Sequence, residues 1–101
     1  MGHAIEILSQ PERAERLAEV LKALAHPLRL RLVAALCQDE CNVQELCSLL
    51  DARQALVSQH LSVLRMVGLV SADRSGGTAT YSIKEPNLRN LVSCLTGCQG
   101  R

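Results

Sequence analysis

The feature that most constrains the fold is a pair of apolar periods in residues 42–70, separated by a short break. The first period is carried by Val43, Leu46, Leu49 and Leu50. The second period is carried by Val57, Leu61, Leu64 and Val67. Residues 51–53 separate the two, and Gly68 ends the second. Spacings of three and four residues place each set on one helix face, so this stretch predicts two short helices joined by a tight turn, the outline of a helix-turn-helix.

The second of these helices has a distinctive polar face. Its members are Gln54, Ser58, Gln59 and His60. In a helix-turn-helix the second helix enters the DNA major groove, where short polar side chains can hydrogen-bond base edges and phosphates. We therefore predict a recognition helix, although the periods alone are also compatible with two plain core helices.

Residues 69–83 predict a β-hairpin directly after that helix. Two short strands, 69–74 and 79–83, flank a Gly-Gly turn. A hairpin in this place is a wing, which can lay Arg74 and threonine hydroxyls against phosphates or the minor groove. The order helix, turn, helix, hairpin indicates a winged helix-turn-helix more specifically than either part alone.

An apolar stripe predicts a helix that ends near residue 24. The stripe consists of Leu17, Val20, Leu21 and Leu24. Ser9 and Glu12 have the spacing of a capping box, and Pro11 suits the first helical turn. Residues 1–8 show no period and are expected to form a loose arm. Because the helix is strongly amphipathic and near one end of the domain, we expect its stripe to serve both the core and a subunit contact.

Two further helices complete the expected domain. Pro27 interrupts the chain and starts a helix that runs to about residue 36. The preceding His26 is expected to be a boundary or capping residue rather than a metal ligand. A last helix has the stripe Leu88, Leu91, Val92 and Leu95, and glycines at positions 97 and 100 end it. The prediction is a mainly α fold of about five helices plus a hairpin wing.

Composition limits the function classes. The net charge is only +1, but residues 1–51 hold five Lys and Arg against eight Asp and Glu, whereas residues 52–101 hold six against two. The predicted recognition helix and wing lie in the basic half, and phosphate contact needs only a local positive surface. No apolar run is long enough to span a bilayer, and no export signal is recognisable, so we expect a soluble, cytoplasmic protein. Five cysteines then indicate reduced thiols.

Four short motifs together resemble those of one family. They are LAHPLRL at residues 24–30, VSQHL at 57–61, GLV at 68–70 and YSI at 81–83. In these motifs the chain resembles the ArsR/SmtB family of bacterial winged-helix repressors, over roughly residues 17–95. The length of 101 residues predicts a single domain over residues 1–101. The resemblance implies a homodimer held by its first and last helices. It also implies binding to an imperfect inverted repeat in promoter DNA, and release when an inducer binds.

The resemblance also carries over a set of DNA-facing residues by position. On the recognition helix these are Gln54, Ser58, Gln59, His60 and Arg65. Arg53 would lie on the turn and Arg74 on the wing. No obligatory cofactor is predicted.

The inducer is not fixed by the resemblance. The zinc-type members of the family have Asp and His ligands along the last helix, but the histidines here are His3, His26 and His60. The arsenic-type pattern, Cys-x-Cys followed by a further Cys, is matched only in part by Cys41 and Cys47. Persulfide-sensing members have one cysteine in the second helix and one near the end of the last, and Cys37 lies one helical turn later than theirs.

The most distinctive thiols are Cys94 and Cys98, which at a spacing of four residues share one face of the last helix. Thiolates select soft ions such as As(III), Sb(III), Cd(II) or Cu(I). A third ligand is needed for strong binding, and Cys37 and Cys41 are the candidates. Cys47 lies between apolar residues and is expected to be a small core side chain. The sequence therefore predicts a repressor that responds to arsenite, antimonite or a soft metal ion.

Three other functions compete with this prediction. A redox or persulfide switch would link Cys37 or Cys41 with Cys94 or Cys98. An enzyme with a cysteine nucleophile is disfavoured, because no phosphate loop or oxyanion motif accompanies the thiols. A protein-contact module would use the same fold without binding DNA above background.

Overall fold

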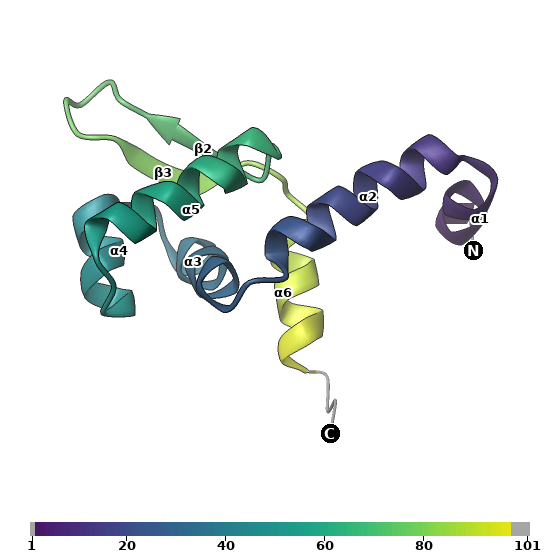
Figure 1. Cartoon of the computed structure of the whole chain (residues 1–101), viewed down its shortest axis with the longest axis horizontal. Helices are drawn as coiled ribbons and strands as arrows, with labels where there is room; N and C mark the ends of the chain where they lie inside the picture. The colour runs from purple at the N-terminus through teal and green to yellow at the C-terminus, as the bar shows by residue number, and fades with distance from the viewer. Residues whose placement is uncertain (1, 98–101) are drawn as a thin grey trace.

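The helix-turn-helix forms where the two apolar periods predict it. The computed structural model describes residues 2–97, with side chains described from residue 6 onward. Helix α4 spans Val43–Leu50 and helix α5 spans Gln54–Met66, and the two lie together at the left of Figure 1. Asp51 turns the chain between them in the left-handed region, with φ of 52°, a conformation that aspartate tolerates better than most residues.

Local capping fixes the start of α4 and the end of α5. The Asn42 side chain accepts a hydrogen bond from the Glu45 amide, and the Glu45 carboxylate accepts one from the Asn42 amide, both at 2.8 Å. This capping box satisfies amides that the first helical turn leaves unpaired. Beyond α5, Gly68 has φ of 85° and its amide donates to the Arg65 carbonyl at 3.0 Å. The predicted glycine stop is therefore confirmed.

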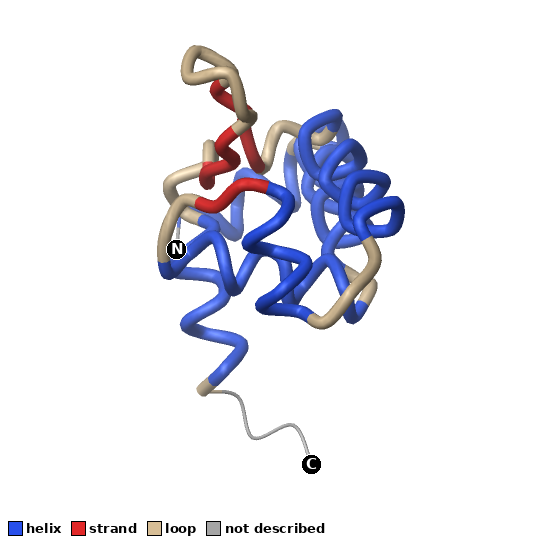
Figure 2. Tube along the Cα trace, turned by 90° about the vertical axis from the view of Figure 1, so that its left-hand side faces the viewer, coloured by secondary structure: helices blue, strands red, loops and turns tan. Residues whose placement is uncertain are grey.

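The predicted wing is part of a three-stranded antiparallel sheet. Its strands are β1 at Cys41–Asn42, β2 at Val70–Asp73 and β3 at Thr80–Ile83, in the order β1-β3-β2. Tyr81 in the central strand lies opposite Cys41 on one side and Ala72 on the other. The hairpin β2-β3 was expected, but β1 was not. In Figure 2 the hairpin loop projects at the top, beyond the helices.

Helices α2 and α3 meet at a sharp corner. Helix α2 spans Pro11–Leu24 and α3 spans Pro27–Gln38, each with proline in its first turn. The His26 ring nitrogen Nδ1 accepts a hydrogen bond from the Leu28 amide at 3.1 Å, which confirms the predicted capping role. The predicted capping box at the start of α2 is wrong, because Gln10 is the N-cap residue and its side chain makes no capping hydrogen bond.

The first residues of the chain depart from prediction. Instead of a loose arm, Gly2–Ser9 forms helix α1, which lies beside the start of α2 at the far right of Figure 1. A salt bridge of 3.2 Å joins Arg13 of α2 to Glu6 of α1. Both partners are largely exposed, so this pair contributes little stability by itself. The described chain thus has six helices instead of about five.

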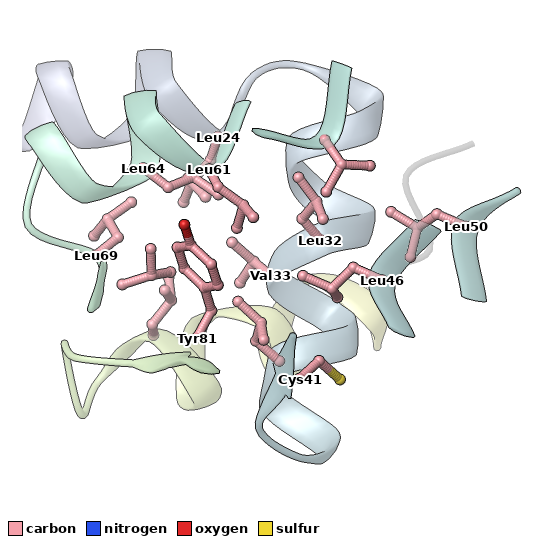
Figure 3. Packing of buried hydrophobic residues seen from close by; sticks show 14 residues of the cluster. Leu24, Leu32, Val33, Cys41, Leu46, Leu50, Leu61, Leu64, Leu69 and Tyr81 are labelled. Carbon is pink, nitrogen blue, oxygen red and sulfur yellow. The ribbon is translucent and has the colours of Figure 1, made fainter. Parts of the chain in front are cut away.

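Leucine and valine fill the core beneath the helix-turn-helix. Leu32 and Val33 of α3 and Leu61 and Leu64 of α5 are fully buried. They belong to the same cluster as Tyr81, and Figure 3 shows Val33, Leu61 and Leu64 near its ring. Since Tyr81 is the chain's single aromatic residue, close packing of branched aliphatic side chains supplies most of the apolar burial.

The last helix, α6, spans Leu88–Thr96 and runs away from the wing, as Figures 1 and 2 show. Leu88 is buried, whereas Leu95 is 49% exposed. On α2, Leu17 and Leu21 are 41% and 57% exposed. The expected stripes are therefore only partly covered by the chain itself. Among the described residues, no helix combines the length and apolarity that crossing a membrane requires.

Candidate DNA-binding surface and thiol sites

Helix α5 presents a polar face to solvent and an apolar face to the core. Gln54 and Gln59 are exposed and Ser58 is half-buried. On the opposite face, Val57 and Leu61 are fully buried. This division leaves amide and hydroxyl groups free to reach base edges in a major groove.

The expected exposure of His60 is wrong, because only 7% of this residue is exposed. Its Nδ1 accepts a hydrogen bond from Nε of Arg29 at 3.1 Å, and its ring lies 4.4 Å from that of His26. Burial lowers the pKa of His60 below its ordinary value of 6.5, and His26 and Arg29 lower it further. The sequence did hold a signal for this placement, since residues 57, 60, 61 and 64 follow the spacing of a buried helical stripe.

Three of the predicted DNA-facing residues are exposed arginines. Arg53 is the exposed N-cap residue of α5 and Arg65 is exposed in its last turn. Arg74 is exposed at the start of the hairpin loop. Guanidinium groups bind phosphate oxygens strongly, so these positions suit backbone contacts on either side of a recognition helix.

The loop of the wing is shaped by local backbone contacts. The Asp73 carboxylate accepts a hydrogen bond from the Ser75 amide at 2.9 Å, and this contact lowers the pKa of Asp73. Gly77 has φ of 90°, which a side chain would disfavour. The loop is therefore bent at residues next to Arg74 rather than extended.

A hollow of about 370 Å³ separates the wing loop from the start of α4 and α5. It is lined by Asn42, Val43, Gln44, Gln54, Gly77, Thr78 and Ala79. Gln44 faces this space together with Gln54, although only Gln54 was singled out from the sequence. Its position in the first turn of α4, just after the capping residue, was the signal that could have identified it.

The cysteines occupy very different environments. Cys41 is buried in β1, and its thiol donates a hydrogen bond to the Asp39 carbonyl at 3.6 Å. Burial raises the pKa of Cys41, and the carboxylates of Glu45 and Asp39 raise it further. The expected pairing of Cys41 with other sensor thiols is thus disfavoured, because the thiolate is the form that binds metals.

Cys37 and Cys47 are half-buried. Burial raises the pKa of Cys37, and the nearby Arg89 partly offsets this rise. Cys47 packs against the apolar core, as predicted. Cys94 is exposed on α6, and Cys98 lies outside the described residues. Among the residues that the structure describes, no three His, Cys, Asp or Glu side chains gather closely enough to hold a metal ion.

A hydrogen bond connects the last helix to the rest of the domain. Nε of Arg89 on α6 donates to the Cys37 carbonyl at the end of α3, at 3.4 Å. On the other side of α6, a hollow of about 680 Å³ opens between α2, α6 and the turn after α5. Leu17 and Val20 of α2 and Leu88 and Leu91 of α6 line it.

Comparison with known proteins agrees with this arrangement. Residues 26–72, which contain α3, the helix-turn-helix and the start of the wing, match the family model described as bacterial regulatory protein, arsR family. Over 91 residues the chain is 40% identical to the biofilm growth-associated repressor of Agrobacterium fabrum, covering 90% of this chain and 78% of that protein. The chain belongs to the ArsR/SmtB family.

Solved structures of ArsR/SmtB-like regulators have the same fold. The transcriptional repressor BigR from Xylella fastidiosa superposes with a TM-score of 0.79 at 37% identity, over 87% of this chain and 92% of BigR. The homodimeric winged helix-turn-helix DNA-binding domain of Mb0332 from Mycobacterium bovis has a TM-score of 0.77 at 29% identity, over 87% and 83%. The chain is thus a transcriptional repressor of this family, and not an enzyme.

Proposed function

We propose that this repressor binds an inverted repeat in promoter DNA as a homodimer and is released when a thiophilic inducer binds its cysteines, above all Cys94 of α6 together with Cys98. The inducers that we expect are arsenite, antimonite and soft metal ions. The observation that carries the proposal is the exposure of Cys94 on α6, a helix tied to α3 by the Arg89 contact. A ligand at this thiol can therefore act on the helix that adjoins the DNA-binding unit.

The polar face of α5 and the wing would bind the operator. Gln54 and Gln59 suit base edges, since side-chain amides can pair with adenine through two hydrogen bonds. Arg53, Arg65 and Arg74 suit phosphates, which hold the protein in register on the duplex. The more basic second half of the chain supports this assignment.

A second copy of the chain would cover the stripes of α2 and α6. Leu17, Leu21 and Leu95 are apolar side chains that the single chain leaves substantially exposed, and the related domain Mb0332 is described as homodimeric. A two-fold dimer presents two recognition helices to half-sites about 34–36 Å apart, one DNA turn. An inverted repeat follows from that symmetry.

Release would follow from a change in dimer geometry. An inducer that binds better to a dimer whose recognition helices no longer match the half-sites lowers operator affinity by its differential affinity for the two states. Coupling of about 1–3 kcal/mol would weaken binding by roughly 5- to 150-fold. Because thiolate is the binding form, the response should weaken at low pH.

A thiol redox or persulfide switch is the second candidate. Its chemistry needs only two thiols for a disulfide or polysulfide bridge. Cys37 on α3 and Cys94 on α6 lie on helices that contact each other. With an oxidant, the two thiols lose two protons and two electrons and one S–S bond forms between them. With polysulfide, zero-valent sulfur of the polysulfide takes up these electrons and protons and leaves as hydrogen sulfide, and any additional sulfur atoms in the bridge come from the polysulfide.

Fluorescence anisotropy would distinguish the candidates. Reduced protein is bound to a duplex selected from a random library and titrated without oxygen with arsenite, Cd(II), Zn(II) or polysulfide. We expect release by stoichiometric arsenite or Cd(II), and the variant C94S/C98S should bind DNA but ignore both ions. Cys47→Ser is the matched control and should respond normally. Release by polysulfide alone would support the redox switch, and normal induction of C94S/C98S would exclude the α6 site.

A further inference from the structure

The guanidinium group of Arg29 forms hydrogen bonds that link helices α2, α3 and α5. Nε of Arg29, on α3, donates to Nδ1 of His60 on α5 at 3.1 Å. Nη1 of the same side chain donates to the carbonyl of Ala23, at the end of α2, also at 3.1 Å. His60 and Ala23 are both buried. Arg29 therefore ties α5 to the corner between α2 and α3.

This hydrogen bond requires neutral His60. A guanidinium group can only donate, so Nδ1 of His60 must be the unprotonated nitrogen and the ring proton must lie on Nε2. Protonation of Nδ1 would set two N–H groups against each other and place a second positive charge beside Arg29. Burial already lowers the pKa of His60, which keeps the ring neutral near neutral pH.

The groups that act electrostatically on His60 come from one end of α3. They are Arg29 and the N-cap residue His26, whose ring lies 4.4 Å from that of His60. Nδ1 of His26 is occupied by the Leu28 amide. Helix α2 adds the Ala23 carbonyl, which Arg29 already holds. Among these groups, Arg29 is the hydrogen-bond partner of His60.

The hydrogen bond between Arg29 and His60 adds a directional constraint to the apolar packing of α5. Val57, Leu61 and Leu64 hold α5 on the core, but apolar burial is not directional. A hydrogen bond weakens steeply when its geometry is distorted. It therefore resists rotation and sliding of α5 relative to α2, which would change where Gln54 and Gln59 meet the DNA.

We propose that Arg29 and His60 are positioning residues for operator binding: neutral His60 fixes α5 on the α2–α3 corner without touching DNA, and protonation of His60 releases it. This inference rests on the proposed DNA-binding function. It replaces direct DNA contact as the expected role of His60. It also makes operator affinity fall under acid conditions, as the pH approaches the lowered pKa of folded His60.

The test uses two substitutions of His60 that differ in hydrogen bonding. His60→Asn keeps an acceptor, Oδ1, at the same number of bonds from the backbone as Nδ1, and it cannot take up a proton. His60→Leu removes the acceptor. His26→Asn is the matched control, because asparagine also caps helices well. Operator affinity is measured by anisotropy between about pH 5 and pH 8, on a duplex that the wild-type chain selects from a random library.

We expect His60→Leu to bind about 10-fold more weakly than wild type near neutral pH, a loss equivalent to about 1.4 kcal/mol. His60→Asn should bind within about 3-fold of wild type at pH 8 and lose the acid weakening. His26→Asn should keep the acid weakening but move it toward higher pH, because His26 no longer lowers the pKa of His60. In nuclear magnetic resonance spectra of the free wild-type protein, the Arg29 Nε–H signal should shift as His60 titrates.

Two results would overturn the positioning role. One is operator binding by His60→Leu as tight as that of wild type, and the other is a wild-type pH profile in His60→Asn. Should His60→Leu fail to fold, His60→Asn and the Arg29 signal still decide the question. Failure of the wild-type chain to select any duplex would instead overturn the DNA-binding function, and the positioning role with it.

Discussion

The winged helix-turn-helix and the outer helices α2 and α6 differ in how completely one chain can bury their apolar side chains. In the first region, Leu46, Leu61 and Leu64 are fully buried. In the second, Leu21 and Leu95 remain about half exposed. Each Å² of apolar surface left in water forgoes about 25 cal/mol. The core of the DNA-reading unit is therefore complete in one chain, although Leu49 and Met66 on its surface are exposed, whereas the apolar stripes of the outer helices are only partly buried.

The largest effect is expected from a substitution in the buried core of the winged helix-turn-helix. Leu61→Ala should lower the free energy of unfolding by about 2–5 kcal/mol, because it removes buried methyl groups and leaves a cavity. Urea unfolding followed by circular dichroism measures this loss. The comparison variant Leu21→Ala, at a half-exposed position, should cost clearly less. An equal cost at both positions would contradict the division into two regions.

A charge placed on the partly exposed apolar stripe of α2 tests whether this stripe is a subunit contact. Leu21→Glu should leave the monomer folded but weaken operator binding by at least about 10-fold, because burying a carboxylate at a subunit contact is costly. Analytical ultracentrifugation should show dissociation of the dimer. Leu49→Glu is the matched control, since Leu49 is 63% exposed but lies on α4, outside the apolar stripes of α2 and α6. Dissociation by both variants would argue against an α2–α6 contact.

A smaller effect is expected at the wing. Arg74→Ala should weaken binding to all sequences about equally, and it should reduce the slope of log affinity against log salt by about 1, as the loss of one phosphate contact does. Anisotropy titrations at several salt concentrations give both values. Lys22→Ala removes the same charge from α2 and should change the slope much less. A loss confined to one base position would show that Arg74 reads sequence instead.

The smallest effect is expected in the pH dependence of stability, through His60 of α5, which Arg29 links to α2. Because the pKa of His60 is lowered on folding, the unfolded chain takes up this proton at a higher pH than the folded chain does. The contribution of His60 to stability is therefore complete above about pH 6.5 and is lost as the pH falls from there toward the folded pKa. Urea midpoints across this range measure the loss, and His60→Asn should remove that part of it. Rising stability toward acid pH would contradict the lowered pKa.

The parts of the fold with local causes could be predicted from the sequence. The stop at Gly68 and the cap at His26 depend on neighbours within a few residues, and the helices follow apolar periods. Strand β1 could not be predicted in this way. It has only two residues, too few for an alternating pattern, and it exists because Cys41 pairs with the distant Tyr81.

The candidate site was predictable to a similar degree. The polar face of α5 follows from spacing, but the burial of His60 depends on Arg29, a partner far away in the sequence. Histidine was placed outside because of its polarity, although its position fitted the buried stripe. Burial of the Cys41 thiol likewise depends on the sheet. Chemistry suggested the residue types, and only tertiary contacts decided which of them face solvent.

Strand β1 has one more consequence for how a signal can reach DNA. Cys41 pairs with the central strand of the wing, and the next residue, Asn42, caps α4. The wing and the first helix of the DNA-reading unit are thus held by two successive residues, so neither can be displaced far without the other. In the proposed repressor, an inducer would therefore have no independent wing to tilt. Its effect would be read out as a change in distance and angle between two rigid units, one from each subunit of the proposed dimer.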